Sequence, residues 1–352
     1  MQELLGRITA LDPTASLGIR VIACFDELIV GQVNTHGLLA AAAALAGCPA
    51  GLSHRGRITR VSPMGESLPA DDSPAAGSAF STTISDDLAV WIERDGAEQA
   101  NDAIISERLA LAVRIRFADH STERGVRDMH ILVDADADVD QRRAAGLQLG
   151  LSATSSYRVI AAPLFAEWSD TVAWPSDVIT TAHGTLHVLV APGDTMSVGA
   201  TPCGIGTAGS VDALAHSFTA ATIALRLCRP PTEPVVCADS LGGLVDMLAD
   251  SRTGSSNPDV EALDSVMQTP WADATIEAVM ASTTLRQAAR ALGIHHSTMQ
   301  SRLETIRTSM GFDPLDGFGR ARLGIAHLLW RLRHSRVLDL PTKCGSVADS
   351  TH

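Results

Sequence analysis

The chain has 352 residues, of which 45% are hydrophobic, 4% aromatic and 19% charged, and its formal net charge is −13. This length suits two or three domains, and the hydrophobic content excludes an intrinsically disordered chain. The six cysteines form no Cys-x-x-Cys pair, which argues against a disulfide scaffold or a zinc site and favours a reducing, cytoplasmic location. No signal-peptide pattern opens the chain, and its longest apolar run is too short for a membrane span.

The N-terminal third predicts helices around a pleated sheet. Residues 1–15 are expected to form an arm, and two helices should follow, from Gly18 onward and from Thr35 to Ala46. After residue 46 the spacing of apolar residues changes from a helical to a strand-like period. Strands are predicted at 50–56, 57–61, 80–84 and 88–92, a loop at 71–78, and a long helix at 98–117.

This order of elements, with the phrase Ala46-Gly-Cys-Pro-Ala-Gly-Leu52, resembles a GAF-like sensor domain, which we assign to residues 16–128. The resemblance implies a small-molecule effector held beneath the long loop. His36, Cys48 and His54 are candidates to line such a pocket, although packed or solvated side chains explain each of them as well. No cofactor is expected, and nothing in the sequence names the ligand.

Alternating aspartates open the middle region. Residues 131–151 are predicted to form one helix whose acidic start and basic middle suit the helix dipole. Asp134, Asp136, Asp138 and Asp140 raise the possibility of a calcium loop. An EF-hand counted from Asp134 would need Gly and Glu where Val139 and Ala145 stand, so a solvated helix start is favoured and no metal is expected.

A glycine-rich segment lies further along the middle region, after strands predicted at 157–163 and 184–190. Gly204, Gly206 and Gly209 form a literal Gly-x-Gly-x-x-Gly before a helix at 211–228. Pro202 and Cys203 leave little room for a leading strand, and Asp212 comes too early for a ribose-binding acid, so a dinucleotide site is disfavoured.

The order of these elements resembles the GGDEF-like middle domain of PucR/CdaR regulators, assigned to residues 129–250. The chain has no Gly-Gly-Asp/Glu-Glu-Phe sequence and no paired carboxylates for a triphosphate-bound metal pair. The resemblance therefore implies a degenerate, non-catalytic cyclase relative used for signal relay or dimer contact. Residues 251–270 are assigned as a linker, in which 252–258 have linker composition and 259–268 are expected to form a small connecting helix.

The C-terminal region predicts a helix-turn-helix. Small and apolar residues recur at three- and four-residue steps up to Leu292, and Gly293 then suits a left-handed helix end. Ile294 is expected at the corner, and the second helix begins at a cap supplied by either His295 or Ser297. Its buried stripe is predicted to comprise Met299, Leu303, Ile306 and Met310.

Positive charge gathers in this region. Residues 271–340 contain nine Arg against six acidic residues, a net charge of +3, whereas residues 1–270 carry 17 basic against 33 acidic residues, a net charge of −16. Because DNA binding depends on phosphate neutralisation, this asymmetry favours a C-terminal DNA-binding domain. The acidic remainder argues against a membrane surface as partner.

The segment from Ala288 to Leu303 resembles the C-terminal helix-turn-helix of the PucR/CdaR family, and so do Gly311-Phe-Asp-Pro314, Arg320 and the apolar helix after it. Two basic positions and a tyrosine of the family are replaced here by His296, Gln300 and Ser301. The domain is assigned to residues 271–340, with a flexible tail at 341–352. The fold class is thus multi-domain α+β, with an all-α C-terminal domain.

The resemblance implies a non-enzymatic, sequence-specific transcriptional regulator that binds double-stranded promoter DNA as a homodimer or higher homo-oligomer. A second helix in the major groove would use its N-terminal residues to contact bases. Candidates for base contact are His296, Ser297, Gln300 and Ser301, and candidates for phosphate contact are Arg286, Arg290, Arg302 and Arg307. Two alternatives remain: a regulator that acts by protein association without DNA, and a nucleotide-binding enzyme.

Overall fold

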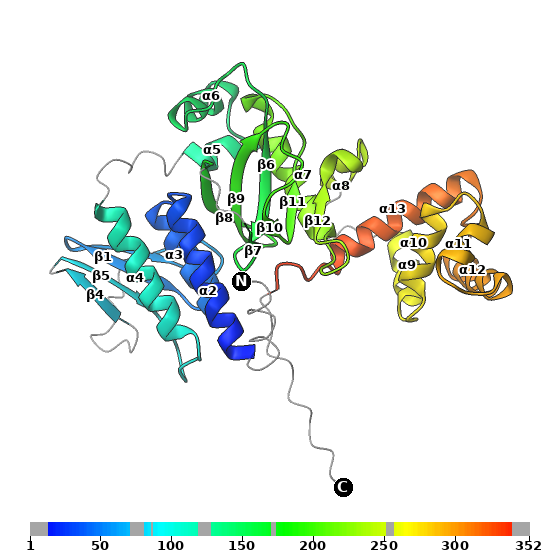
Figure 1. Cartoon of the computed structure of the whole chain (residues 1–352), viewed down its shortest axis with the longest axis horizontal. Coiled ribbons are helices and arrows are strands. Elements are labelled where there is room, and N and C mark those ends of the chain that lie inside the picture. Colours follow the sequence, from blue (N-terminus) through cyan, green and yellow to red (C-terminus); the bar gives the residue numbers. More distant parts are fainter. Residues whose placement is uncertain are drawn as a thin grey trace, which may run out of the picture. The chain divides into compact units, whose positions relative to one another are not determined.

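The computed structural model describes residues 13–70, 81–85, 87–118, 128–169, 174–250 and 257–339. Four predicted segments lie wholly or partly outside these ranges: residues 1–12 of the arm, the loop at 71–78, residues 251–256 of the linker and the tail. Residues 13–15, predicted to belong to the arm, instead form the start of the first described helix. The described chain divides into two compact units. The first unit runs up to Gly242 and includes the residues from Arg336 onward, and the second unit is Gly243–Ser335. The chain is a mixed α/β protein with a helical C-terminal region (Figure 1).

The first unit opens with helices on one side of an antiparallel sheet. The helices α2 (Pro13–Val30) and α3 (Thr35–Ala46) precede five strands with the order β3-β2-β1-β5-β4, and α4 (Asp102–Ala118) follows them. The strands are β1 (Ala50–His54), β2 (Arg57–Val61), β3 (Ser67–Leu68), β4 (Ser81–Ser85) and β5 (Leu88–Ile92). The predicted helices and strands of this region are confirmed, although α4 begins at Asp102 rather than at residue 98.

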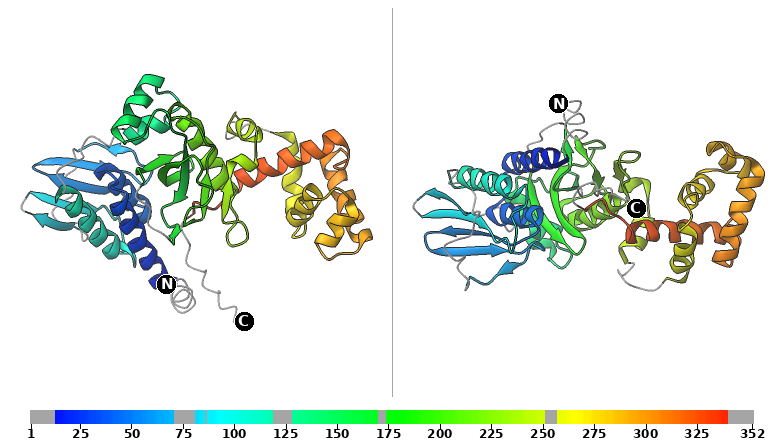
Figure 2. Two further views of the ribbon diagram at one scale, coloured as in Figure 1. Left: turned by 45° about the horizontal axis from the view of Figure 1, so that its top comes forward. Right: turned by 90° about the horizontal axis from the view of Figure 1, so that it is seen from below.

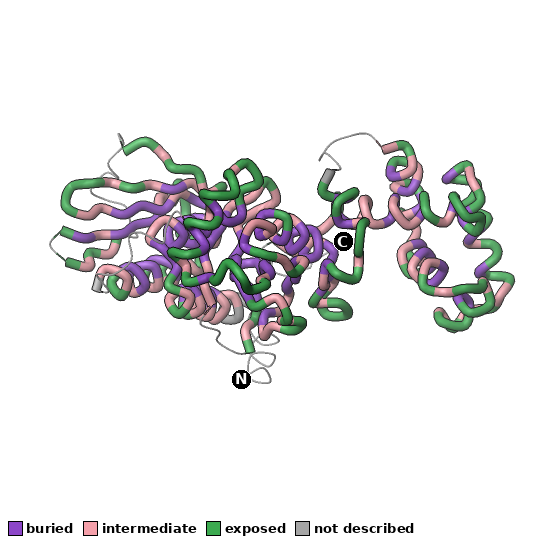
Figure 3. Tube along the Cα trace, turned by 90° about the horizontal axis from the view of Figure 1, so that it is seen from above, coloured by how far each residue is buried: buried purple, intermediate pink, exposed green. Residues whose placement is uncertain are grey.

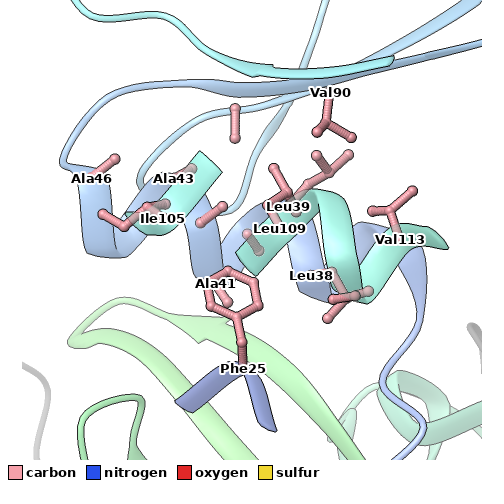
Figure 4. Close-up of a cluster of buried hydrophobic side chains, with 14 of the residues drawn as sticks. Phe25, Leu38, Leu39, Ala41, Ala43, Ala46, Val90, Ile105, Leu109 and Val113 are labelled. Atoms are coloured by element: carbon pink, nitrogen blue, oxygen red, sulfur yellow. The ribbon is translucent and has the colours of Figure 1, made fainter. Parts of the chain in front are cut away.

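Small residues let these helices pack closely. The alanine-rich α3 is buried along most of its length, and Figure 4 shows Leu38, Leu39 and Ala43 beside the α4 residues Ile105 and Leu109. Asn34 caps α3 by accepting a hydrogen bond from the Gly37 N–H at 2.8 Å, and Gly47 ends it in a left-handed conformation with φ 66°. Aliphatic side chains thus form a core in which aromatic residues are rare.

A second sheet completes the first unit, with the order β12-β11-β6-β9-β8. Only the β11–β12 pair is parallel. The strands of this second sheet are β6 (Tyr157–Pro163), β8 (Ser176–Thr181), β9 (Gly184–Pro192), β11 (Cys203–Ile205) and β12 (Val235–Cys237). Two further strands, β7 (Glu167–Trp168) and β10 (Ala200–Thr201), pair only with each other. Helix α7 (Leu214–Leu227) packs on β6 and β11 (Figure 2), and its start is preceded by a 3-10 turn, Val211–Ala213.

The single helix predicted at 131–151 is wrong. The structure has two helices there, α5 (Asp128–Val133) and α6 (Val139–Gln148). Asp134 and Asp138 cause the break, because their side chains accept hydrogen bonds from the backbone N–H groups of Asp136 and Gln141. Arg142 donates to the backbone carbonyl of Asp134 at 2.9 Å. The aspartates therefore make the turn and cap α6.

The Gly-x-Gly-x-x-Gly segment brings α7 close to the sheet. A Cβ at Gly204 would lie 2.1 Å from the carbonyl oxygen of Ala221, and one at Gly206 would lie 2.1 Å from that of Ser217. Any larger residue would push the helix off β11. Little room for a leading strand was expected at Pro202 and Cys203, yet Cys203–Ile205 is a short strand. Gly204 lies within this strand, close to the backbone of α7.

The second unit is entirely helical in its described part. It contains α8 (Leu244–Asp250), α9 (Pro258–Met267), α10 (Ala272–Ala281), α11 (Leu285–Ala291), α12 (His296–Met310) and α13 (Gly317–Arg333). The helix predicted as a connector, α9, packs against both α12 and α13 and contributes Val260, Leu263 and Val266 to their core. In this helical unit the buried stretches of the helices face one another and the exposed stretches lie outside (Figure 3).

Candidate nucleic-acid interface

The first helix of the helix-turn-helix, α11, is bounded by local hydrogen bonds. The hydroxyl of Thr284 accepts from the Gln287 N–H at 3.3 Å, and the Gln287 side chain accepts from the Thr284 N–H at 3.2 Å, a reciprocal capping box. At the other end Gly293 has φ 64°, and the Ile294 N–H donates to the Ala289 carbonyl at 3.0 Å. The predicted glycine-terminated turn is confirmed.

The start of α12 is decided in favour of His295. Its Nδ1 accepts a hydrogen bond from the backbone N–H of Ser297 at 3.3 Å and lies 2.8 Å from the Ser297 hydroxyl. A ring nitrogen thus takes the place of the usual hydroxyl or carboxylate cap. The helix ends at Gly311, whose φ is 72°. These caps place His296 and Ser297 in the first turn of α12.

The packing of α12 leaves its polar side free. Met299, Leu303, Ile306 and Met310 are all buried, as their spacing predicts. Ala288 and Ala289 of α11 are buried as well, so small side chains lie where the two helices approach. Consequently the side of α12 opposite the core is exposed and can meet another surface.

The predicted contact residues divide by exposure. The exposed ones are Arg286, Arg290, Ser297, Gln300, Ser301 and Arg307. His296 and Arg302 are partly buried. Gln300 and Ser301 follow Ser297 by about one turn, so these three side chains lie along the start of one helical face. The structure therefore brings the predicted base-contacting residues together on α12 and supplies two exposed arginines on α11.

Arg302 contacts the domain itself. Its Nη1 donates a hydrogen bond to the Thr275 hydroxyl at 3.1 Å, and its guanidinium lies 5.3 Å from the centre of the Trp271 ring. Both partners belong to the start of α10. These contacts join α12 to α10 and turn the arginine toward the protein, a role that its spacing in the sequence did not indicate.

An acidic residue shares the outer face of α12. Glu304 is exposed and accepts a hydrogen bond from Arg307 at 2.7 Å. This bond raises the pKa of Arg307, which therefore stays protonated. Because the carboxylate offsets the positive charge of the arginine, the net charge on the last two turns of α12 is lower than the arginine alone would suggest.

The closing helix is fixed to the helix-turn-helix by backbone contacts. Arg320 donates to the carbonyl oxygens of Val279, Met280 and Ser282 at 2.7, 3.1 and 2.5 Å, and so satisfies the C-terminal end of α10. A Cβ at Gly319 would lie 1.8 Å from the Asp313 carbonyl oxygen, so the turn before α13 requires glycine there. The motif residue Arg320 thus acts as a helix cap.

A second group of polar residues in this unit was not predicted from the sequence. Asp273 and Glu277 lie one turn apart on α10, and His327 of α13 lies against them, with its Nε2 2.7 Å from Asp273 Oδ1. In the sequence, the four-residue spacing of the two carboxylates could have indicated that they share one face of a helix. The histidine is 50 positions further along, so only the packing of α10 on α13 reveals it.

Comparison with known proteins identifies the second unit. The PucR C-terminal helix-turn-helix domain matches residues 274–329. Residues 274–329 are therefore a PucR-type helix-turn-helix, which supports a transcriptional regulator. No curated protein matches the chain significantly.

One similar solved structure is that of a regulator of polyketide synthase expression from Bifidobacterium adolescentis. It is 16% identical, and the alignment covers 59% of this chain and 97% of that chain with a TM-score of 0.26. At this TM-score the likeness establishes neither a shared arrangement nor a shared function. Separately, none of the helices in the described ranges combines the length and apolar character needed to cross a bilayer.

Proposed function

We propose that this chain, whose residues 274–329 form a PucR C-terminal helix-turn-helix domain, is a transcriptional regulator that binds promoter DNA sequence-specifically. The observation that carries the proposal is the exposed polar face at the start of α12, formed by Ser297, Gln300 and Ser301. A helix of this kind enters the major groove with its N-terminal residues against base edges. The proposal places the protein in the cytoplasm, where such DNA lies.

Each residue on this face has a distinct proposed role. The Gln300 amide suits a bidentate pair of hydrogen bonds to adenine, and the hydroxyls of Ser297 and Ser301 suit single contacts to bases or phosphates. His296, partly buried beside them, is proposed to contact the edge of the groove. Arg286 and Arg290 on α11 are proposed to bind the phosphate backbone, which positions the domain without selecting a sequence.

The remaining two arginines contribute less directly. We propose that Arg307 reaches phosphate only by leaving Glu304, so its net contribution to affinity is small. For Arg302 we propose a positioning role, because its bonds to α10 orient α12. Since a single helix-turn-helix covers only a few base pairs, we further propose that two or more copies bind together, with half-sites about one helical turn of DNA apart.

We propose that the first unit receives a small-molecule signal through a GAF-like part at 16–128. A GGDEF-like part, assigned to 129–250, follows it, and its last residues, 243–250, belong to the second unit. A cavity of about 330 Å³ supports this proposal. His36, Glu66, His130 and Thr180 are among its lining residues, and this volume suits a small metabolite. Burial lowers the pKa of both histidines, so they are neutral hydrogen-bonding groups near pH 7.

The test uses fluorescence anisotropy of the full chain with DNA from upstream of its own gene and with a scrambled duplex, at low and physiological salt. We expect the native duplex to bind more tightly and to resist added salt better. Gln300→Ala should reduce the preference for the native duplex by roughly 5- to 150-fold, since one bidentate base contact contributes about 1–3 kcal/mol. Thr308→Ala, an exposed change two turns further along α12, is the matched control and should bind like the wild type.

One observation favours a second function, regulation through protein association alone. The outer face of α12 includes the carboxylate of Glu304, which opposes phosphate, and its first two turns carry no exposed arginine. If both duplexes fail to bind at low salt while the protein still self-associates in sedimentation, this second function replaces the first. Equal binding of both duplexes would instead refute sequence specificity for the DNA tested.

A further inference from the structure

Three metal-ligating side chains converge on the side of the second unit formed by α10 and α13. Asp273 and Glu277 lie on one face of α10, and His327 reaches them from α13. One ligand atom from each residue lies within 4.8 Å of the other two. The His327 side chain is 6% exposed, whereas those of Asp273 and Glu277 are 44% and 33% exposed. The cluster is thus closed on the histidine side and open to water on the carboxylate side.

The donor set selects a class of cation. One imidazole and two carboxylates suit Zn²⁺ and similar first-row divalent ions, whereas Ca²⁺ and Mg²⁺ prefer oxygen ligands alone. Metal–ligand distances of roughly 2.0–2.2 Å in a tetrahedron place ligand atoms about 3.4 Å apart. In the structure His327 Nε2 lies 2.7 Å from Asp273 Oδ1, and all three ligand atoms lie within 4.8 Å of one another, which is the range of spacings that such a site needs.

The surrounding charge also permits a cation. Arg331 Nη1 lies 3.9 Å from Glu277 Oε1, which is longer than a hydrogen bond. Counting Asp273, Glu277 and Arg331, the formal charge beside the histidine is −1, which a divalent ion would convert to +1. The alternative is that these residues form a clamp of ion pairs that joins the helices without any metal, and the experiment below separates the two.

We propose that Asp273, Glu277 and His327 bind one Zn²⁺ ion, with water as the fourth ligand on the open side. The ion joins α10 to α13. Because α10 also carries Thr275, the hydrogen-bond partner of Arg302, the ion stabilises the support on which α12 rests. The site stands apart from the proposed DNA contacts, which lie on α11 and the exposed face of α12.

The test is calorimetric titration of the chelator-treated full chain with ZnCl₂, together with thermal unfolding with and without the ion. We expect one saturable site per chain and a higher Tm with Zn²⁺. Glu277→Gln, which keeps the side-chain size, should weaken binding by roughly tenfold or more and abolish the Tm increase. His334→Gln is the matched control, since His334 follows α13, lies 3.7 Å from Asp264 Oδ1 and is not part of the cluster.

The added metal could instead bind to cysteine thiolates elsewhere in the chain, and Co²⁺ as a spectroscopic substitute for Zn²⁺ distinguishes the two kinds of site. Co²⁺ bound by nitrogen and oxygen lacks the intense thiolate charge-transfer absorption that a cysteine site would show. We expect weak visible bands without that absorption, lost in Glu277→Gln. The proposal is overturned if the wild type shows no saturable binding, if Glu277→Gln binds as tightly as the wild type, or if thiolate absorption appears.

Discussion

Arginines that look alike in the sequence of the helix-turn-helix have different tasks in the structure. Arg290 is exposed on α11, whereas Arg302 bonds to Thr275 and stacks near Trp271. A solvated arginine can turn to a phosphate at little cost, but an arginine held by two internal partners would have to break those contacts first. Surface exposure therefore separates proposed phosphate contacts from residues that position α12.

The first prediction compares these two arginines. Arg302→Ala should lower the free energy of unfolding by about 1–3 kcal/mol, because the hydrogen bond and the ring contact are lost. Arg290→Ala should leave stability within about 0.5 kcal/mol of the wild type but weaken DNA binding and reduce the salt slope by about 1. Urea unfolding and salt-dependent anisotropy measure the two effects. A stable Arg302→Ala protein with a reduced salt slope would show that Arg302 contacts phosphate instead.

At the scale of secondary-structure elements, close backbone approach decides which residues are tolerated. Gly204 and Gly206 allow α7 to lie against β11, and their sequence pattern, typical of nucleotide sites, here serves packing. Gly319, in the first turn of α13, likewise allows the backbone of Asp313 to lie close to the helix. A glycine motif alone does not distinguish a bound phosphate from an adjacent helix, because both need the absence of a Cβ.

The second prediction tests this packing. Gly204→Ala should lower the free energy of unfolding by several kcal/mol, since the new Cβ would clash with helix backbone that cannot rotate away. Gly243→Ala is the control: a Cβ there meets nothing within 4 Å, and the effect should stay within about 1 kcal/mol of zero. Chemical denaturation measures both. Equal stability of the two variants would contradict the close contact of α7 with β11.

The third prediction concerns the contact of α3 with β8. Asp177 of β8 is buried, and its carboxylate accepts hydrogen bonds from the Asn34 side chain at 2.5 Å and from the Val178 N–H at 2.8 Å. Burial raises the pKa of Asp177 from 3.8 to about 7, although both hydrogen bonds and the charge of Arg116 oppose the shift. His130 faces the same carboxylate, with its Nε2 4.0 Å from Oδ2.

The sign of the pH effect follows from these pKa values. Between about pH 4 and pH 7 the folded protein holds a proton on Asp177 that the unfolded chain releases, so the stability that Asp177 contributes falls as the pH rises. His36 and His130, whose pKa values are lowered by burial, contribute the opposite slope. The difference in unfolding free energy between the wild type and Asp177→Asn should therefore decrease from pH 4 to pH 7. A difference that is constant over this range would refute the raised pKa.

At the scale of the whole molecule, the two units have separate cores. The core of the second unit draws on α9 to α13 and includes Leu263, Ile276, Leu303 and Leu323. The C-terminal region also holds the net positive charge of the chain, whereas the rest is acidic. The same division thus appears in packing and in electrostatics.

The fourth prediction is that residues 243–335 fold on their own. The helices α9 to α13 form a hydrophobic core among themselves. The isolated fragment should therefore unfold in one cooperative transition and bind the same duplex as the full chain. Its affinity should be lower if the first unit supplies dimer contacts. Circular dichroism and anisotropy test this expectation. A fragment without a cooperative transition would show that the second unit depends on the first for its stability.

The sequence by itself determined the features that rest on short-range physics. The helix end at Gly293, the buried stripe of α12, the alanine-rich α3 and the predicted strands of the first sheet follow from residues within a few positions of one another. The PucR-type helix-turn-helix was therefore recognisable from its own segment.

Only the tertiary structure decided the contacts between distant segments. The Asn34–Asp177 bond, the place of α9 in the core and the meeting of His327 with Asp273 join residues separated by tens of positions or more. The break between α5 and α6, in contrast, rests on local hydrogen bonds of Asp134 and Asp138 that the helical prediction did not weigh. Local propensity is weak compared with burial, so the orientation of Arg302 and the role of the glycine motif were set by what packs against them.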